Sequence, residues 1–418
     1  MNSNQKGKQK IELDAIHDFS HKLVRPELLP MLKDYVHWQI SVREKNRDQL
    51  AISKLPEYSP VSINLDLTTA CNYQCGHCID IDILNKKFDF DFEQLKLSLE
   101  LMITQGLKSV IVIGGGEPTV HPKFSELIYF LKERRVQVGV VSNGSRMEKL
   151  QGVAGILQHP DWIRLSLDSG TDQTFQAMHK PRKKLTLQEI CKAVPIVREL
   201  NQNLDIGFSF IVTWKGAFNK KEAIVENISE IYQAARLARD NDFTYFSIKP
   251  FLERAPDNNA EVVGIDNKER SFEETIKRIR SEVKKARTLE TDNFRVVEST
   301  NLKVLESGDF SQYTAQPKCC HITFFRQVFS PLGIFSCPVY RHVDEAKLGD
   351  QWSLSTNERR EEFKTTVGNQ IMEFDASANC KKVVCLYNST NWFIDDLINN
   401  PEKLDDLSNE SVTSDFFF

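Results

Sequence analysis

Cysteine is the residue type whose spacing in this sequence points most directly to chemistry. The chain has nine cysteines among 418 residues. An odd number, in a chain that starts with a polar segment instead of an apolar signal core, argues against a secreted disulfide framework. The cysteines form an early group, a lone residue and a late group: Cys71, Cys75 and Cys78; Cys191; and Cys319, Cys320, Cys337, Cys380 and Cys385. Such grouping in a reducing compartment indicates metal binding.

The early group has the spacing C-x3-C-x2-C and directly follows a predicted strand at 61–67. Three thiolates this close can bind three irons of a [4Fe–4S] cluster and leave the fourth iron with an open coordination position. A zinc site that uses His77 as its fourth ligand is the alternative that the spacing alone leaves open.

Repeated strand–helix units position this loop. Apolar periodicity predicts six strands, at 61–67, 108–113, 136–141, 162–167, 205–213 and 243–249. Helical patterns follow the strands, at 92–105, 122–135, 147–157, 172–180, 186–201 and 219–241. This alternation is typical of an α/β protein with a parallel sheet or barrel, whose functional residues lie at the C-terminal ends of the strands.

The segments that flank these units have a different character. Residues 11–54 predict helices, and 268–290 predict a charged amphipathic helix with a solvated face. Beyond residue 319 the sequence predicts a β-hairpin followed by helices near 354–366 and 388–398. We therefore expect a helical N-terminal extension, a core barrel, a helical connector and a small α+β C-terminal domain, at 1–60, 61–250, 251–315 and 316–418.

Composition excludes several classes of protein. The chain is 27% charged and 40% hydrophobic with a formal net charge of −4, so its charge balance gives no indication of a nucleic-acid or anionic-membrane partner. No apolar stretch approaches the ~20 residues that a membrane span requires. From the sequence we expect a cytoplasmic protein.

The early cysteines and three further motifs together resemble the radical S-adenosylmethionine (SAM) enzymes. Gly114-Gly-Gly-Glu-Pro118 ends the second predicted strand and resembles the family's GGEP motif, and Ser142-Asn-Gly144 ends the third, like the common TNG. Arg164-Leu-Ser-Leu-Asp168 ends the fourth and is similar to the S-L-D segment. The resemblance covers about 61–250 and implies a partial (β/α)6 TIM-like barrel. His77 occupies a position that is usually aromatic in the family.

The resemblance also implies which residues contact SAM. The GGEP segment would bind the methionyl ammonium, with Glu117 as an acceptor, and Asn143 would hold the sugar. Ser166 and Asp168 would contact the carboxylate or ribose, and Arg182 would pair with the carboxylate, although solvation at the surface explains Arg182 equally well. We expect His121 and His179 to be turn or helix residues and not ligands. The full set of expected SAM-contacting residues is Gly115, Gly116, Glu117, Pro118, Ser142, Asn143, Ser166, Asp168 and Arg182.

The mechanism that the resemblance implies begins at a reduced [4Fe–4S] cluster. One electron would cleave SAM to methionine and a 5′-deoxyadenosyl radical, which abstracts a hydrogen atom from the substrate. Such an enzyme needs a reductant, such as flavodoxin or ferredoxin. The protein would position the substrate and exclude water.

The late cysteines are similar to the SPASM/twitch extension of this superfamily, in which a hairpin and a helix carry an auxiliary [4Fe–4S] cluster. Five cysteines compete for four ligand positions, so either Cys319 or Cys320 would be free. The free thiol is either packed in the core or a hydrogen-atom donor. Four thiolates could instead hold a structural zinc. Cys191 lies among apolar residues and is predicted to belong to the core.

The substrate is the part of the function on which the sequence says least. A single auxiliary cluster and no visible peptide-recognition module favour a small molecule, such as a sugar, aminocyclitol, nucleoside or amino-acid derivative. Oxidation or epimerisation would be the reaction. Modification of a ribosomally made peptide is the alternative, and a non-catalytic zinc or scaffold protein is a third. The candidate substrate-contacting residues are Thr213, Trp214, Lys249, Glu253 and Arg254.

Overall fold

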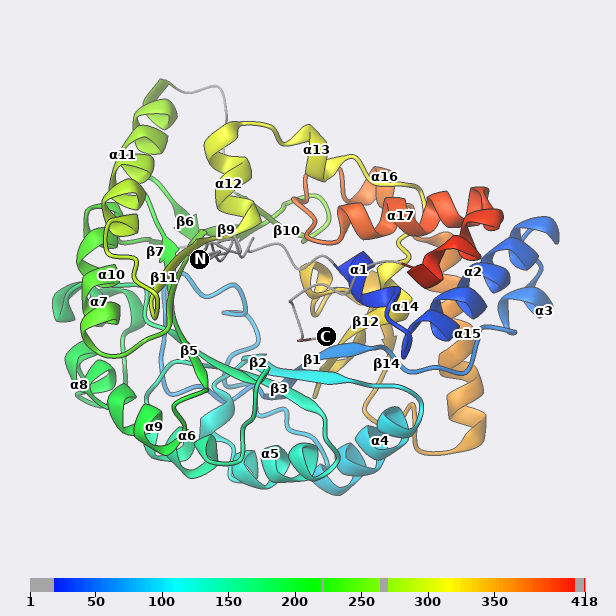
Figure 1. Cartoon of the computed structure of the whole chain (residues 1–418), viewed down its shortest axis with the longest axis horizontal. Helices are drawn as coiled ribbons and strands as arrows, with labels where there is room; N and C mark the ends of the chain where they lie inside the picture. Colours follow the sequence, from blue (N-terminus) through cyan, green and yellow to red (C-terminus); the bar gives the residue numbers. More distant parts are fainter. Residues whose placement is uncertain (1–18, 220–221, 264–269, 410–416, 418) are drawn as a thin grey trace, which may run out of the picture.

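The computed structural model describes residues 19–219, 222–263, 270–409 and 417. Its centre is a ten-stranded sheet in the order β11-β8-β5-β4-β3-β2-β1-β12-β13-β14. Six parallel strands form the arc visible in Figure 1: β1 (Ser62–Thr68), β2 (Ser109–Gly115), β3 (Gln137–Ser142), β4 (Trp162–Ser166), β5 (Asp205–Val212) and β8 (Tyr245–Pro250). The two edge strands are different and do not pair with each other, so the sheet is a partial barrel, as predicted.

Helices cover the outer side of this arc (Figure 1). They are α4 (Phe92–Thr104), α5 (Phe124–Glu133), α6 (Met147–Ala154), α7 (Asp172–His179), α8 (Leu187–Lys192), α9 (Val194–Leu200) and α10 (Ile231–Asp240). Alternate strand residues such as Ile163 and Leu165 are fully buried, while Arg164 and Ser166 between them are only partly buried. Because side chains alternate along a strand, the apolar set faces the helices and the polar set faces the inside of the arc.

The six predicted strands are confirmed to within a few residues, but one predicted helix is wrong over half its length. Instead of a helix from 219, the chain forms the strand pair β6 (Phe218–Asn219) and β7 (Glu222–Ala223), then the short helix η2 (Ile228–Glu230). The reason is Asn227, whose buried amide donates to the carbonyl oxygens of Asp168 and Ile211, both at 2.8 Å. These tertiary hydrogen bonds hold the segment extended across the end of β5.

The C-terminal segment continues the sheet. β12 (Arg326–Ser330) pairs in parallel with β1, and β13 (Gly333–Phe335) and β14 (Lys347–Gly349) follow antiparallel. β12 and β13 are the predicted hairpin. The helices of this segment are α14 (Ile322–Phe325), α15 (Asn357–Glu373), α16 (Ala376–Asn379) and α17 (Asn388–Asn399).

The N-terminal helices lie beside this segment (Figure 1). They are α1 (Phe19–Leu23), α2 (Leu29–Glu44) and α3 (Gln49–Ile52). Arg43 on α2 forms a 3.0 Å ion pair with Asp395 on α17, and the Tyr35 hydroxyl lies 2.9 Å from Nδ1 of His321. The part of the predicted extension before Phe19 lies outside the described residues.

The segment predicted as a helical connector contains strands as well as helices. It forms the hairpin of β9 (Leu252–Arg254) and β10 (Glu261–Val263), then α11 (Arg270–Arg287), β11 (Arg295–Glu298), α12 (Thr300–Ser307) and α13 (Ser311–Thr314). β11 pairs in parallel with β8 and widens the arc.

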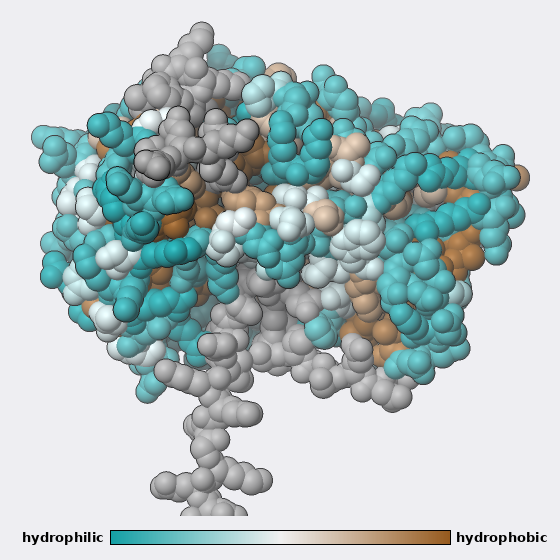
Figure 2. All heavy atoms as spheres, turned by 90° about the horizontal axis from the view of Figure 1, so that it is seen from above, coloured by the Kyte–Doolittle hydropathy of each residue, from teal (hydrophilic) through white to brown (hydrophobic). Residues whose placement is uncertain are grey.

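The surface in Figure 2 is mostly hydrophilic, and its hydrophobic side chains gather in small, separate areas. Among the described residues no helix combines the length and apolar character needed to cross a membrane.

Candidate active site

The early cysteine group lies in the loop that follows β1. Cys71, Cys75 and Cys78 are partly buried and form no disulfide. Burial raises the pKa of the Cys71 thiol to about 11, and burial together with the charges of its two neighbours raises that of Cys75 well above its ordinary value. Three buried thiols that repel one another when ionised fit a site whose negative charge a cationic metal group neutralises.

Two histidines and a carboxylate surround Cys75. Nε2 of His77 lies 3.0 Å from Oδ2 of Asp168, and Nε2 of His179 lies 3.4 Å from the same oxygen. Nδ1 of His179 lies 3.2 Å from Sγ of Cys75, while its Nε2 lies 3.0 Å from the Leu167 carbonyl oxygen. Burial lowers the pKa of His179 to about 4, so the ring is neutral, donates to Leu167 and accepts from the thiol.

His179 ends α7, as the helical pattern predicts, but its contact with Cys75 was not foreseen. The donor atoms of Cys75, His77 and His179 lie within 4.8 Å of one another, which is close enough for a metal ion. This trio differs from the zinc site that the spacing suggested, because it contains His179 and neither Cys71 nor Cys78.

Both carboxylate oxygens of Asp168 have partners within the protein. Oδ1 accepts a 2.7 Å hydrogen bond from the backbone N–H of Ile211, and Oδ2 faces His77. Burial opposes ionisation of Asp168, but its hydrogen bond to His77 and the charges of the two histidines hold its pKa below the ordinary value. Its expected contact with SAM stays a prediction.

Glu117 joins the ends of β2 and β3. Its buried carboxylate accepts hydrogen bonds from the backbone and hydroxyl of Thr119, at 3.0 and 2.5 Å, from the Ser142 hydroxyl at 2.8 Å and from the Asn143 backbone at 2.7 Å. Burial raises the pKa of Glu117 although these bonds oppose the rise. The side chain predicted to accept from the methionyl ammonium thus already fixes the two motif loops, and Pro118 begins the short helix η1 (Pro118–Val120) behind it.

The glycine run packs against the loop that carries the cysteines. A Cβ on Gly116 would overlap the carbonyl oxygen of Ala70, and the backbone N–H of Glu117 donates to that oxygen at 2.8 Å. Gly115 has φ +75°, a conformation that side-chain-bearing residues rarely adopt. The close approach that these glycines permit is therefore to the segment that immediately precedes Cys71.

Asn143 and Arg182 reach the rim of the same loop. The Asn143 amide donates to the side-chain oxygen of Asn72 at 3.0 Å, and the Asn72 amide donates to Ser145 at 2.7 Å. The backbone N–H of Arg182 donates to the Asn72 carbonyl at 3.1 Å, and its exposed guanidinium favours the ionised form of Cys71. The structure brings both residues next to the cysteines; their contacts with SAM stay predictions.

The charges of four late cysteines interact with one another, and the fifth, Cys319, is affected by the adjacent Cys320. Burial is the largest cause of the raised pKa of Cys337, Cys380 and Cys385. The charges of neighbouring thiolates raise these pKa values further: Cys320 acts on all three, Cys337 acts on Cys380 and Cys385, and Cys380 acts on Cys385. Together they raise the pKa of Cys337 to about 12. The four come from the chain before α14, after β13, at the end of α16 and before α17. These four thiols from separate elements, two of them buried and two partly buried, fit a cluster without an open position.

Cys319 points toward other elements. Its Sγ lies 3.1 Å from the Ile371 carbonyl oxygen on α15 and 3.9 Å from Nε2 of Gln39 on α2. Its neighbours thus belong to the helical layer and not to the strand ends that carry the early group. This placement favours Cys320 as the fourth thiol and Cys319 as the packed one.

An ion-pair group links the segment after Cys337 with the segment after Cys78. Arg341 lies 3.1 Å from Asp80 and 3.4 Å from Asp66 on β1, and Asp80 also accepts from the Gly115 backbone at 3.3 Å. Burial opposes ionisation of Asp80, but Arg341 and His342 hold the pKa of this carboxyl below its ordinary value. Sequence reasoning missed this group; the charged Asp66 within the apolar strand 61–67 was the signal that could have found it.

The candidate substrate-contacting residues do not share one environment: some are packed in the core, one belongs to the ion-pair group and one is on the inner face of the arc. Thr213 is buried and donates to the Val225 carbonyl at 2.6 Å, and Trp214 packs edge-on against Phe251. Arg254 lies 3.7 Å from Asp80 and forms part of the ion-pair group. Lys249, in contrast, is on the inner face of β8.

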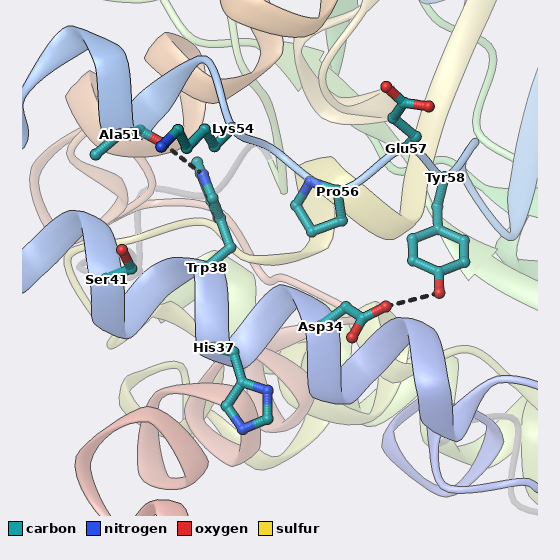
Figure 3. A pocket seen from close by; sticks show the side chains of 9 residues that line it. All are labelled: Asp34, His37, Trp38, Ser41, Ala51, Lys54, Pro56, Glu57 and Tyr58. Atoms are coloured by element: carbon teal, nitrogen blue, oxygen red, sulfur yellow. Dashed lines mark hydrogen bonds between the residues drawn. The ribbon is translucent and has the colours of Figure 1, made fainter.

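Two pockets differ in their distance from this chemistry. One, of about 840 Å³, lies between the β9–β10 loop and the segment after Cys337, and its wall includes Arg254, His342 and Tyr340. The Tyr340 hydroxyl is 3.9 Å from Sγ of Cys380. The other, of about 580 Å³, lies between α2 and the chain after α3, and no cysteine lines it (Figure 3).

Comparison with known proteins identifies the domain around the early cysteines. Residues 65–245 match the Radical SAM superfamily. The S-adenosylmethionine-dependent nucleotide dehydratase RSAD2 of Oncorhynchus mykiss is 30% identical over 41% of this chain and 49% of its own. The antilisterial bacteriocin subtilosin biosynthesis protein AlbA of Bacillus subtilis is 25% identical over 56% of this chain and 49% of its own. The chain spans about half the length of these curated relatives.

Solved structures support the fold over a larger part of the chain. Streptococcus suis SuiB matches 82% of this chain and 76% of its own with a TM-score of 0.55 and 13% identity. AnSMEcpe with bound AdoMet and Cp18Cys peptide matches 84% of this chain and 99% of its own, with a TM-score of 0.51 and 14% identity. At these identities the likeness concerns the fold alone.

Proposed function

We propose that this chain, whose residues 65–245 match the Radical SAM superfamily, is a radical SAM enzyme that abstracts a hydrogen atom from a small-molecule substrate in an oxidation or an epimerisation. Enzymes of this superfamily use SAM and a [4Fe–4S] cluster, and they need a reductant, for which flavodoxin or ferredoxin is suited. When bound, the cluster supplies the electron that cleaves SAM to methionine and a 5′-deoxyadenosyl radical.

The observation that carries this proposal is the early thiol group beside the joined motif loops. Cys71, Cys75 and Cys78 would hold the cluster through three irons. Glu117 fixes the ends of β2 and β3 next to them through four hydrogen bonds, so the SAM-binding surface is held in one geometry before SAM arrives. The glycine-lined loop keeps the cysteine loop against this surface.

The second thiol group supports an auxiliary [4Fe–4S] cluster held by Cys320, Cys337, Cys380 and Cys385. Four thiolates would leave no iron open, so this cluster would accept electrons or stabilise the fold and would not bind substrate. An electron acceptor close to the substrate is what a two-electron oxidation requires, and this favours oxidation over epimerisation. In this proposal the chain divides into an N-terminal extension, a core, a connector and a cluster-bearing domain at the expected boundaries.

Three observations favour a small molecule over a peptide. The inner face of the arc carries polar and cationic side chains, and a pocket of about 840 Å³ is within the size range of small-molecule sites. Several curated relatives are named nucleotide dehydratases. The fold likeness to SuiB and anSMEcpe keeps peptide modification as the second candidate, because both have been solved with a peptide.

Metal analysis after anaerobic purification tests the proposal. We expect about eight irons and a similar amount of sulfide per chain, and about four irons in Cys71→Ala, which would also lose SAM cleavage. Cys191→Ala is the matched control, since this buried thiol lies on α8 among apolar residues and should leave the iron content unchanged. Zinc in place of iron in the wild-type protein would overturn the proposal.

A further inference from the structure

Three serines lie side by side on the inner face of the arc. In the strand register Ser166 of β4 pairs with Ser209 of β5, which in turn pairs with Ser247 of β8. Their neighbours along the strands, such as Phe208 and Phe246, are fully buried against the outer layer. Because neighbouring strands are about 4.8 Å apart, the three hydroxyls form a row of about 10 Å.

Two cations flank this row. Arg164 precedes Ser166 on the same face of β4, and Lys249 follows Ser247 on the same face of β8. Among the described residues neither side chain has a carboxylate or a hydrogen-bond acceptor as partner, and the buried Nε of Arg164 has none. Arg164 makes one aromatic contact, with its guanidinium 5.2 Å from the Trp162 ring.

The nearest titratable groups do not neutralise these cations. The charge of Asp168 raises the pKa of Lys249, but the Asp168 carboxylate accepts its hydrogen bonds from His77 and Ile211. Tyr245 faces Arg164 as a neutral phenol, since burial raises its pKa to about 12. Burial and the charge of Arg164 lower the pKa of Lys249 well below its ordinary value, which is the behaviour of a cation that lacks its anionic partner.

Two like charges on a buried surface are unfavourable unless an anion compensates them. Serine hydroxyls between the cations would donate hydrogen bonds to the same anion. We propose that Arg164, Lys249 and the hydroxyls of Ser209 and Ser247 bind an oxyanion group of the substrate, a phosphate or a carboxylate, while Ser166 at the end of the row stays an expected SAM contact. This inference rests on the proposed function and narrows its substrate to an anionic small molecule.

Anaerobic calorimetric titration of the reconstituted enzyme tests the site. Pyrophosphate and succinate are the two probes, and excess SAM is present so that its own carboxylate site is filled. We expect one probe to bind, and Lys249→Met and Arg164→Met each to weaken that binding about ten- to hundredfold, because each removes a charge-assisted contact. Lys277→Met, which removes an exposed lysine from α11, is the matched control and should bind like the wild type.

The outcomes separate the two sources of the anion. Binding of pyrophosphate that both variants weaken supports the site with a phosphate, and the same result with succinate supports it with a carboxylate. Lys249→Arg should restore most of the affinity, and iron content and thermal unfolding establish that each variant is folded. Failure of both probes to bind, or binding that Lys249→Met and Lys277→Met change equally, overturns the site.

The proposed function is measured separately. 5′-Deoxyadenosine formed by the wild-type enzyme without any probe reports SAM cleavage. A protein that cleaves SAM but binds neither probe refutes the anion site and leaves the proposed function standing, whereas absence of SAM cleavage refutes the proposed function whatever the titrations give.

Discussion

At the scale of single residues, buried carboxylates organise the region between the two cysteine groups. Asp66, Asp80 and Glu261 lie close enough for their charges to interact, and Arg254 and Arg341 lie among them. The three do not behave alike. Arg341 and His342 keep Asp80 ionised, whereas burial dominates at Glu261 and raises its pKa to about 7 although Arg254 is 3.5 Å away.

This raised pKa predicts a pH dependence of stability. The unfolded chain loses the Glu261 proton near the ordinary pKa of 4.5, whereas the folded chain keeps it until about pH 7. The stability that Glu261 contributes is therefore fully present below about pH 4.5 and is lost as the pH rises to 7, by up to about 3 kcal/mol.

Thermal unfolding of the wild type and Glu261→Gln between pH 4.5 and 7.5 measures this loss. The variant should lose less stability over the range, because its amide does not ionise. Glu273→Gln, an exposed position on α11, is the control and should follow the wild type. Parallel profiles of the wild type and Glu261→Gln would contradict the assignment.

The adjacent cysteines offer a second test at the residue scale. Cys320→Ala should lose about four of the eight irons, because it would remove one of the four proposed ligands of an auxiliary cluster. Cys319→Ala should keep all of them, since Sγ of Cys319 lies against the Ile371 carbonyl and the Gln39 amide in the helical layer. Iron loss from Cys319→Ala with full occupancy in Cys320→Ala would reverse the assignment. If both variants also form product normally, neither thiol donates a hydrogen atom.

At the scale of elements, the contact between the GGEP loop and the cysteine loop is the critical one. Gly116→Ala would force its Cβ onto the Ala70 carbonyl and move the chain that leads into Cys71. We expect a destabilisation of about 1–3 kcal/mol and a loss of iron from the early site.

Gly152→Ala is the matched control for this change. Nothing lies within 4 Å of a Cβ at Gly152, which is on the helix α6. The substitution should stabilise the protein by about 0.5–1 kcal/mol, because alanine favours a helix more than glycine does. Equal iron content in the two variants would show that the loop contact does not hold the site.

The strands and their pairing were only partly predictable from the sequence. Strand periodicity predicted the six strands of the arc, because each buries one apolar face locally. It did not predict that β12 pairs with β1, since the pairing joins segments far apart in the chain. The cysteines and motif loops of the site were predicted from their spacing. Arg341 and Asp80 were not, because isolated charges in a sequence are typical of solvated surface and only tertiary structure brings them together.

At the scale of the whole molecule, Arg341 ties the C-terminal segment to the core by its contacts with Asp66 and Asp80. Arg341→Met would remove the cation nearest to two buried carboxylates, Asp66 and Asp80, and would leave Arg254 3.7 Å from Asp80. We expect a destabilisation of about 3–5 kcal/mol, measured by denaturant unfolding. Arg359→Met removes an exposed pair with Asp350 and should cost no more than about 1 kcal/mol. Equal costs would mean that the buried ion-pair group does not hold the two parts together.

We expect the early thiol group to support radical cleavage of SAM. Its most direct measurement is the amount of 5′-deoxyadenosine that the reconstituted enzyme forms from SAM under reducing, anaerobic conditions. The account predicts formation of 5′-deoxyadenosine by the wild type, and none by Cys71→Ala, Cys75→Ala or Cys78→Ala. A wild-type protein that holds its iron and forms no 5′-deoxyadenosine, or a Cys75→Ala protein that forms as much as the wild type, would contradict it.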